Sequence, residues 1–175
     1  MPVRIPFAEP APGTRAAKIL ERAPVNIMRL LAHSEEAMAA FSGMGAAILS
    51  KSTLDPALRE LAILRVGHVL GAVYETTHHE RIGRRVGMSE AQIAGARAGA
   101  GAPGLSEDDA LVIAFAEEFN AGAVSAATFA RAAKRFSHAE LIDLAIASGF
   151  YGLVSRFLNS FGLDEIEDTP DSLGR

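Results

Sequence analysis

The sequence predicts an all-α fold, and three observations support this. Apolar residues recur at three- and four-residue spacing along most of the chain, while no segment alternates with the period of two typical of strands. Helix-capping residues open the periodic segments, and glycines close several of them. We find no internal repeat and no linker, so we expect one domain over 1–175, with a core at about 26–162 and extended arms at 1–15 and 164–175.

The first predicted helices occupy 25–31 and 38–49, where apolar residues follow the helical period. Ser34 lies between these segments and is a suitable N-cap, with two glutamates directly after it. Asp55 followed by proline is a strong start signal, because proline is tolerated at the first helical position. We therefore expect the next helix to run from 56 to about 70.

Gly71 provides a break, after which a further helix is predicted from about 72 to 86, ending at Gly87. Ser89 and Gln92 are spaced as a capping box and open a short helix, which should stop in the glycine-rich loop at 99–104.

Three serines mark the remaining helix starts. Ser106 precedes a helix to about residue 121, and Ser125 precedes a shorter one to about 136. Ser137 opens a capping box and the last long helix, which should reach about 161 before Gly162. The polar tail from residue 164 is expected to be loose.

Composition narrows the class of protein. Apolar residues make up 49% of the chain and charged residues 22%, as in globular proteins, and a net charge of −4 gives no electrostatic reason to bind nucleic acid. The absence of cysteine excludes disulfides and thiolate metal sites. The N-terminal stretch is broken by prolines, and the uncharged stretch 144–155 is too short to cross a bilayer. We expect a cytoplasmic protein with no membrane partner.

The segment 58–79 concentrates titratable groups among apolar residues. Such groups are costly at core-facing positions unless they are paired, and clusters of them mark functional sites more often than chance. We therefore place the site in this segment, which contains Glu60, His68, Tyr74, Glu75, His78 and His79.

The spacing of these residues predicts their geometry. If Gly71 reverses the chain, Glu60 lies 11 residues before the bend and His79 lies 8 after it. At 1.5 Å per helical residue the two are about 16 Å and about 12 Å from the bend, at similar heights. We expect the side chains of Glu60 and His79 to approach within a hydrogen bond or one water.

Two pairs on the second helix suggest acid–base chemistry. Glu75 and His79 are four residues apart and share a helix face, so the carboxylate can orient the imidazole and raise its basicity. Tyr74 and His78 form a second such pair on an adjacent face. This arrangement favours a general acid/base pair.

Three motifs in order resemble a known family. They are Arg59-Glu-Leu-Ala-Ile-Leu-Arg65, Gly71-Ala-Val-Tyr-Glu-Thr-Thr-His-His79 and Gly87-Met-Ser-Glu90. Together with the run from Phe150 to Asn159, they resemble the carboxymuconolactone decarboxylase family, whose superfamily includes alkyl hydroperoxidase D-like proteins. The resemblance extends over about 26–162. It implies an all-α hydroperoxidase D-like helical bundle that assembles into trimers or hexamers, with the site near a subunit interface.

The resemblance separates two branches of that superfamily. The peroxidase branch has a Cys-x-x-Cys pair where this chain has Ala72 and Glu75, so a peroxiredoxin activity implied by the family would lack its thiols. His79 and Glu60 match the histidine and the proton-relaying glutamate of the pattern.

The Tyr-Glu-x-x-His arrangement is similar to the decarboxylase branch. That branch often has an aromatic residue at Thr76 and an asparagine at Gly152. These two departures leave the substrate open.

The decarboxylase resemblance implies a cofactor-free lyase or isomerase acting on a small carboxylated lactone or related acid. Loss of carbon dioxide leaves a carbanion that must be stabilised and protonated. The predicted catalytic residues are His79, Glu75, Glu60, Tyr74 and His78. The predicted substrate-binding residues are Arg65, Arg156 and Tyr151, with either arginine holding a carboxylate.

Other interpretations of these residues remain open. Glu75, His78, His79 and His68 are suitable metal ligands, although adjacent histidines on a helix point about 100° apart. A structural pairing of Glu60 with Arg65 is an alternative to its catalytic role, and a non-catalytic oligomeric scaffold would lack a pocket beside His79. The sequence does not decide which carboxylate is the more basic, and His33 and His138 fit surface or capping roles.

Overall fold

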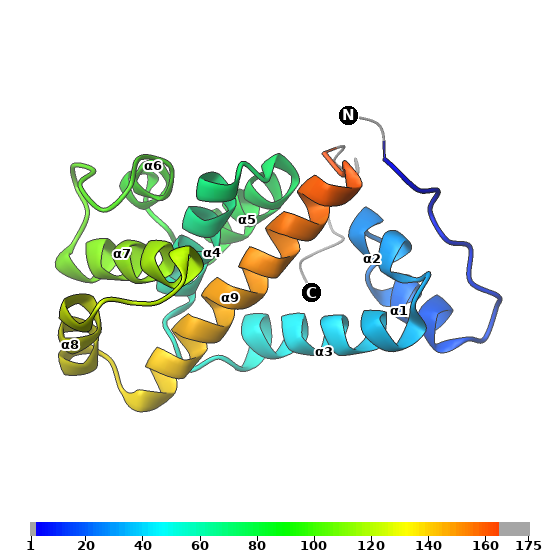
Figure 1. The fold of residues 1–175 in the computed structure, drawn as a ribbon, viewed down its shortest axis with the longest axis horizontal. Coiled ribbons are helices and arrows are strands. Elements are labelled where there is room, and N and C mark those ends of the chain that lie inside the picture. Colours follow the sequence, from blue (N-terminus) through cyan, green and yellow to red (C-terminus); the bar gives the residue numbers. More distant parts are fainter. Residues whose placement is uncertain (1–2, 165–175) are drawn as a thin grey trace.

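The computed structural model describes residues 3–164, which form nine α-helices and no strand (Figure 1), so the all-α prediction is confirmed. The predicted starts and ends agree with the observed helices to within about three residues, with one helix unforeseen. The helices are α1 (Arg15–Arg22), α2 (Asn26–Leu31), α3 (Glu35–Lys51), α4 (Pro56–Leu70), α5 (Val73–Arg85), α6 (Glu90–Ala98), α7 (Glu107–Ala121), α8 (Ala126–Arg135) and α9 (His138–Phe161).

Helix α4 is the centre of the fold. It packs against α5, α6, α7 and α9, and the run from Leu61 to Leu64 is fully buried. Because this stretch is enclosed by neighbouring helices, Arg59 and Glu60 beside it are buried as well. Their charged groups therefore meet other protein groups instead of water.

A tight connection sets α5 against α4. Gly71 ends α4 with φ of 66°, a left-handed conformation that glycine adopts without steric cost. At Gly67 an added Cβ would lie 2.8 Å from Cγ2 of Thr76, so only glycine allows the two helices to approach this closely. The predicted reversal at Gly71 is confirmed.

Helix α9 holds both ends of α4. Before α4 begins, Ser52 Oγ and Thr53 N donate hydrogen bonds of 3.1 and 2.6 Å to Oδ2 of Asp143 on α9. Where α4 ends, Asn159 Nδ2 donates to the carbonyl oxygen of Leu70 at 2.7 Å. The position of α4 thus depends on a helix that lies about ninety residues later in the chain.

The N-terminal part lies across α9 from the rest of the molecule. Figure 1 shows α1–α3 on one side of α9 and α4–α8 on the other. Helix α1 was not predicted: Thr14 caps it, and Oε2 of Glu35 on α3 accepts a 3.0 Å hydrogen bond from the backbone N–H of Ala16. Ser34 is at the N-cap of α3 as expected, but its side chain makes no capping bond.

The described arm at 3–14 contains no helix, as expected, and it is fastened to the body by hydrogen bonds from Arg4 N to the Phe161 carbonyl and from Ala8 N to the Arg29 carbonyl. The other predicted arm lies, apart from its first residue, outside the described residues. Helix α9 is long and apolar enough to cross a membrane by length and composition alone. Half of its apolar stretch is buried inside the fold, where α9 packs against α4 and α7.

Candidate active site

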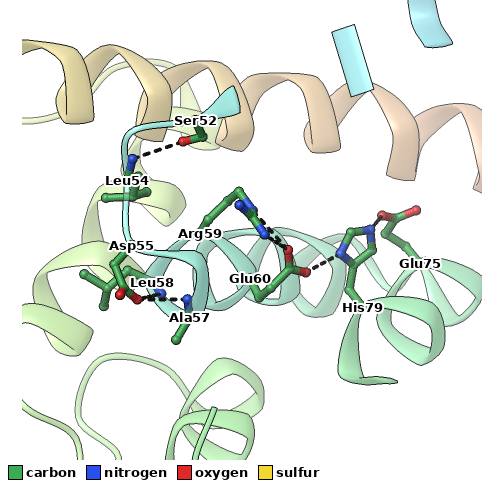
Figure 2. Close-up of polar contacts among 9 residues, drawn as sticks. All are labelled: Ser52, Leu54, Asp55, Ala57, Leu58, Arg59, Glu60, Glu75 and His79. Atoms are coloured by element: carbon green, nitrogen blue, oxygen red, sulfur yellow. Dashed lines mark hydrogen bonds and ion pairs between the residues drawn. The ribbon is translucent and has the colours of Figure 1, made fainter. Parts of the chain in front are cut away.

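One histidine bridges two carboxylates at the centre of the site. His79 Nδ1 lies 2.6 Å from Oε2 of Glu60, which comes from α4, and His79 Nε2 lies 2.8 Å from Oε1 of Glu75, one turn earlier on α5 (Figure 2). The close approach of Glu60 and His79 predicted from the spacing is confirmed. Both ring nitrogens are therefore engaged by carboxylates.

Arg59 completes a balanced set of charges. Its Nε and Nη2 donate hydrogen bonds of 3.1 and 3.0 Å to Oε1 of Glu60, the oxygen that His79 does not contact. All four residues are buried, with Glu60 fully inaccessible. Isolated buried charges are expensive, but here two positive and two negative groups neutralise one another. We call Arg59, Glu60, His79 and Glu75 the buried quartet.

The buried quartet keeps His79 protonated. Burial disfavours the imidazolium, but the charges of Glu75 and Glu60 outweigh burial and raise the pKa of His79 to about 10. The imidazole is therefore a cation at neutral pH. Its Nδ1 makes a hydrogen bond with Glu60, and its Nε2 forms a short ion pair with Glu75.

Aromatic rings enclose the histidines. The ring of Tyr151 on α9 meets the ring of His79 edge-on, with 4.7 Å between the ring centroids. The ring centroids of Tyr74 and His78 are 4.6 Å apart. Burial, followed by the charges of Glu75 and Glu60, raises the pKa of the Tyr151 phenol well above its ordinary value. Tyr151 is therefore a neutral phenol at any physiological pH.

A cavity of about 280 Å³ opens beside the buried quartet, between α2 and α3 on one side and α5 and α9 on the other. Glu75 and His79 line it, whereas Glu60 and Arg59 do not. The order from core to cavity is thus Arg59, Glu60, His79, Glu75. The remaining polar side chains of the lining are Tyr74, His78, Tyr151 and Ser42.

Most predicted site residues converge there, but Arg65 does not. Its Nε lies 2.5 Å from Oε1 of Glu117, and its Nη1 donates to the carbonyl oxygens of Ala96 and Arg97 at 3.1 and 2.9 Å. It therefore bonds to carbonyl oxygens at the end of α6 and does not line the cavity. The alternative pairing of Arg65 with Glu60 is also wrong, because Glu60 pairs with Arg59.

Arg156 is likewise occupied outside the cavity. Its Nη1 donates to the carbonyl oxygen of Gly152 at 3.0 Å, one turn back on α9, and its Nη2 donates to that of Asn120 at 3.4 Å. A Cβ at residue 152 would clash with Oδ1 of Asn120, whose amide group is fixed by the carbonyl oxygens of Ala116 and Ser148, and this accounts for glycine at this departure from the family pattern.

The proposed metal ligands do not gather. His68 lies on α4 away from the cavity, with Nε2 4.0 Å from Oε1 of Glu80. Among residues 3–164 no group of three or more His, Cys, Asp or Glu side chains is arranged to hold a metal ion.

Arg59 is a member of the site that the sequence did not predict. It begins the motif Arg59–Arg65, and its position next to Glu60 in the sequence was the available signal for their ion pair.

Comparisons with known proteins agree with this fold. The model of the carboxymuconolactone decarboxylase family matches residues 35–118, which confirms the resemblance seen in the sequence and includes every member of the buried quartet. A search of curated proteins finds no match.

Solved structures share the helical arrangement. A peroxidase-related protein with an alkylhydroperoxidase AhpD core from Ralstonia eutropha JMP134 has a TM-score of 0.78 at 20% identity, covering 95% of this chain and 93% of its own. A peroxidase-related protein from Silicibacter sp. TM1040 has a TM-score of 0.77 at 17% identity, covering 99% and 95%. A cysteine-to-alanine variant of the debrominase Bmp8, in complex with 2,3,4-tribromopyrrole, has a TM-score of 0.70 at 18% identity, covering 86% and 82%.

Proposed function

We propose that this chain, a cysteine-less relative of the carboxymuconolactone decarboxylase family, is an enzyme that transfers a proton to or from a small substrate without a cofactor. One observation carries the proposal: a buried carboxylate–imidazolium–carboxylate series ends at Glu75, on the wall of a substrate-sized cavity. Titratable groups buried in a concave site are candidates for acid–base catalysis.

The geometry divides the roles differently from the sequence prediction. The sequence predicted an acid–base imidazole at His79 that Glu75 orients, but both ring nitrogens of His79 face carboxylates. Glu75 is therefore the group that acts on the substrate, and His79 positions it and stabilises its charge. Glu60, held by Arg59, fixes the imidazolium from the far side. A general base oriented by a second group is a recurrent catalytic arrangement.

The tyrosines supply the second requirement of such a reaction. When Glu75 takes a proton from a carbon next to a carbonyl, the electron pair of the broken C–H bond moves into the carbonyl oxygen. A phenol can stabilise that oxyanion by hydrogen bonding, and Tyr74 and Tyr151 both line the cavity. Returning the proton to a different carbon completes an isomerisation. In a decarboxylation, the bond to carbon dioxide breaks first, its electron pair moves into the carbonyl, and Glu75 passes the imidazolium proton of His79 to the carbanion.

A non-catalytic scaffold is less well supported. That alternative expected no pocket beside His79, whereas a cavity of about 280 Å³ lies there. Ligand pockets are commonly about 300–1,000 Å³, so the cavity suits a small molecule.

Thiol peroxidase chemistry is not carried over from the structural relatives. This chain has no cysteine, and peroxide reduction of that kind begins with attack by a thiolate. We expect no dithiol-dependent turnover of alkyl hydroperoxides above that of heat-denatured protein. Robust turnover by metal-free protein would contradict this expectation.

Solvent deuterium exchange tests proton transfer before the natural substrate is identified. Purified protein is incubated in deuterated buffer with a panel of small ketones and lactones, and deuterium at carbon is measured by mass spectrometry. Glu75→Gln should abolish exchange, whereas Glu90→Gln, which removes an exposed carboxylate on α6, should retain it. Equal exchange by both variants would remove Glu75 from the mechanism.

Assembly into trimers or hexamers is part of the same proposal. Ile142, Ile146 and Leu153 on α9 are exposed apolar residues, and such side chains are commonly buried between subunits. Light scattering at micromolar concentration tests this, and a monomer would count against it.

A further inference from the structure

We infer that the cavity beside Glu75 selects an uncharged, mostly apolar carbonyl compound and discriminates against carboxylates. This inference rests on the proposed function and narrows it to the isomerisation of a neutral compound, because a decarboxylation needs a carboxylated substrate. It departs from the carboxylated lactone that the family resemblance implied, since among residues 3–164 no arginine lines the cavity to bind a carboxylate.

The first support is the absence of a permanent cation. Within the described part of the chain, no lysine or arginine lines the cavity. Arg59 is committed to Glu60, and the two arginines expected to bind a substrate carboxylate are engaged by Glu117 and by backbone carbonyls. A carboxylate entering this space would lose its hydration without gaining a guanidinium or ammonium partner.

The second support is the charge that the cavity does contain. The positive charge of His79 is already balanced inside the buried quartet, and the quartet presents Glu75 to the cavity. A substrate carboxylate near the reacting position would therefore meet another carboxylate. The other histidine of the lining, His78, has its ring against Tyr74.

The third support is the division of the cavity into two ends. Carboxylate, imidazole and phenol groups all come from α5 and α9. The facing wall from α2, α3 and the segment before them is built from apolar side chains, except for one serine: Val25, Ile27, Met28, Phe41, Leu49 and Ser42. Such a cavity matches a molecule with one polar reacting end and an apolar body.

A pair of ligands that differ in charge but not in shape tests the inference. Phenylacetone and phenylacetate have the same number of non-hydrogen atoms, and a methyl group in one replaces a charged oxygen in the other. Isothermal titration calorimetry at neutral pH should give a Kd for phenylacetone at least about tenfold below that for phenylacetate. Equal affinities, tighter phenylacetate binding, or no binding of phenylacetone up to its solubility would overturn the inference.

A new cation in the apolar wall should strengthen the binding of phenylacetate and so oppose the preference for phenylacetone. Ser42 is half-buried on α3 and lines the cavity, so Ser42→Lys places an ammonium opposite Glu75. We expect this variant to bind phenylacetate at least about tenfold more tightly than the parent protein does. Ser50→Lys, on the same helix but exposed and outside the cavity, is the matched control and should leave both affinities unchanged. Unchanged phenylacetate binding by Ser42→Lys would also overturn the inference.

Binding and exchange separate this inference from the proposed function. Tight phenylacetone binding without deuterium exchange at its carbons would support the charge selectivity but refute proton transfer. Exchange of carboxylated and neutral compounds at the same rate and affinity would support proton transfer and refute the selectivity.

Discussion

Helices α4 and α5 carry two histidine–glutamate pairs in which the pKa of the histidine is shifted in opposite directions. In one, His79 of α5 contacts Glu60 of α4 at 2.6 Å; in the other, His68 of α4 lies 4.0 Å from Glu80 of α5. The pKa of His79 is raised to about 10, whereas that of His68 is lowered. The same two residue types on the same helices therefore give a cation in one place and a neutral imidazole in the other.

The neighbours of each pair explain the difference. His79 has two carboxylates, and the one on α4 is fixed by Arg59. Burial lowers the pKa of His68, the nearby Arg97 lowers it further, and Glu80 opposes them only in part. Glu80 is shared, because Arg84 and Arg97 both form ion pairs with it. Of these two histidines, the ionised one is the one whose neighbouring carboxylates outnumber the arginines that compete for them.

The largest expected effect is on stability. Glu60→Gln leaves the buried Arg59 without its anionic partner, which should lower the free energy of unfolding by about 3–5 kcal/mol. Glu80→Gln breaks ion pairs nearer the surface and should cost less than about 1 kcal/mol. Urea unfolding followed by circular dichroism measures both. Equal losses would mean that the two pairs contribute equally to the free energy of unfolding, against this prediction.

The second largest expected effect is on turnover, which should depend on His79 and not on His68. We expect His79→Gln to keep the fold but lower turnover about a hundredfold or more, because Glu75 loses the cation that positions it. Glu75→Gln should also lower turnover, and the two losses should be less than additive if the residues act as a unit. His68→Gln is the matched control and should retain activity. Unfolding of His79→Gln would point to a structural role instead.

Titration should show opposite pH dependences. His79 should hold its proton until about pH 10, so its contribution to stability is fully present below its unfolded pKa of about 6.5 and is lost between about 6.5 and 10. His68 has a lowered pKa, so its contribution is present above about 6.5 and is lost as the pH falls below that value. NMR of the imidazole carbons follows both. Coincident titration curves would refute the contrast.

The smallest expected effect is at His68 alone. Its Nε2 is buried without a hydrogen-bond partner, so His68→Leu should change the free energy of unfolding by less than about 1 kcal/mol at pH 7.5. Below about pH 6.5 the variant should lose less stability than the parent protein, since it has no imidazole to protonate. Urea unfolding across that range checks this, and a loss as large as that of Glu60→Gln would contradict it.

Features set by neighbouring residues were predictable from the sequence. Caps such as Ser106 and Ser137 act within one turn, and Gly71 fixes the reversal that brings Glu60 to His79. These short-range rules sufficed to place the candidate site on the correct pair of helices.

Features set by distant partners were missed. Helix α1 is stabilised by a hydrogen bond to Glu35 of another helix. Arg65 pairs with Glu117, 52 residues later in the chain, and not with a group of the cavity. The ring orientation of His79, which places a carboxylate at each nitrogen, depends on packing against Tyr151 of α9. Neither periodicity nor spacing contains that information.

The attachment of α9 to both ends of α4 also bears on when the site forms during biosynthesis. Asp143 and Asn159 hold residues about ninety positions earlier, so these contacts close long loops. Contacts of this separation slow folding, and a chain emerging from the ribosome makes them only after residues 138–161 have left the exit tunnel. Glu60 and His79 are both synthesised in the first half of the chain, yet their final geometry has to wait for its last helix.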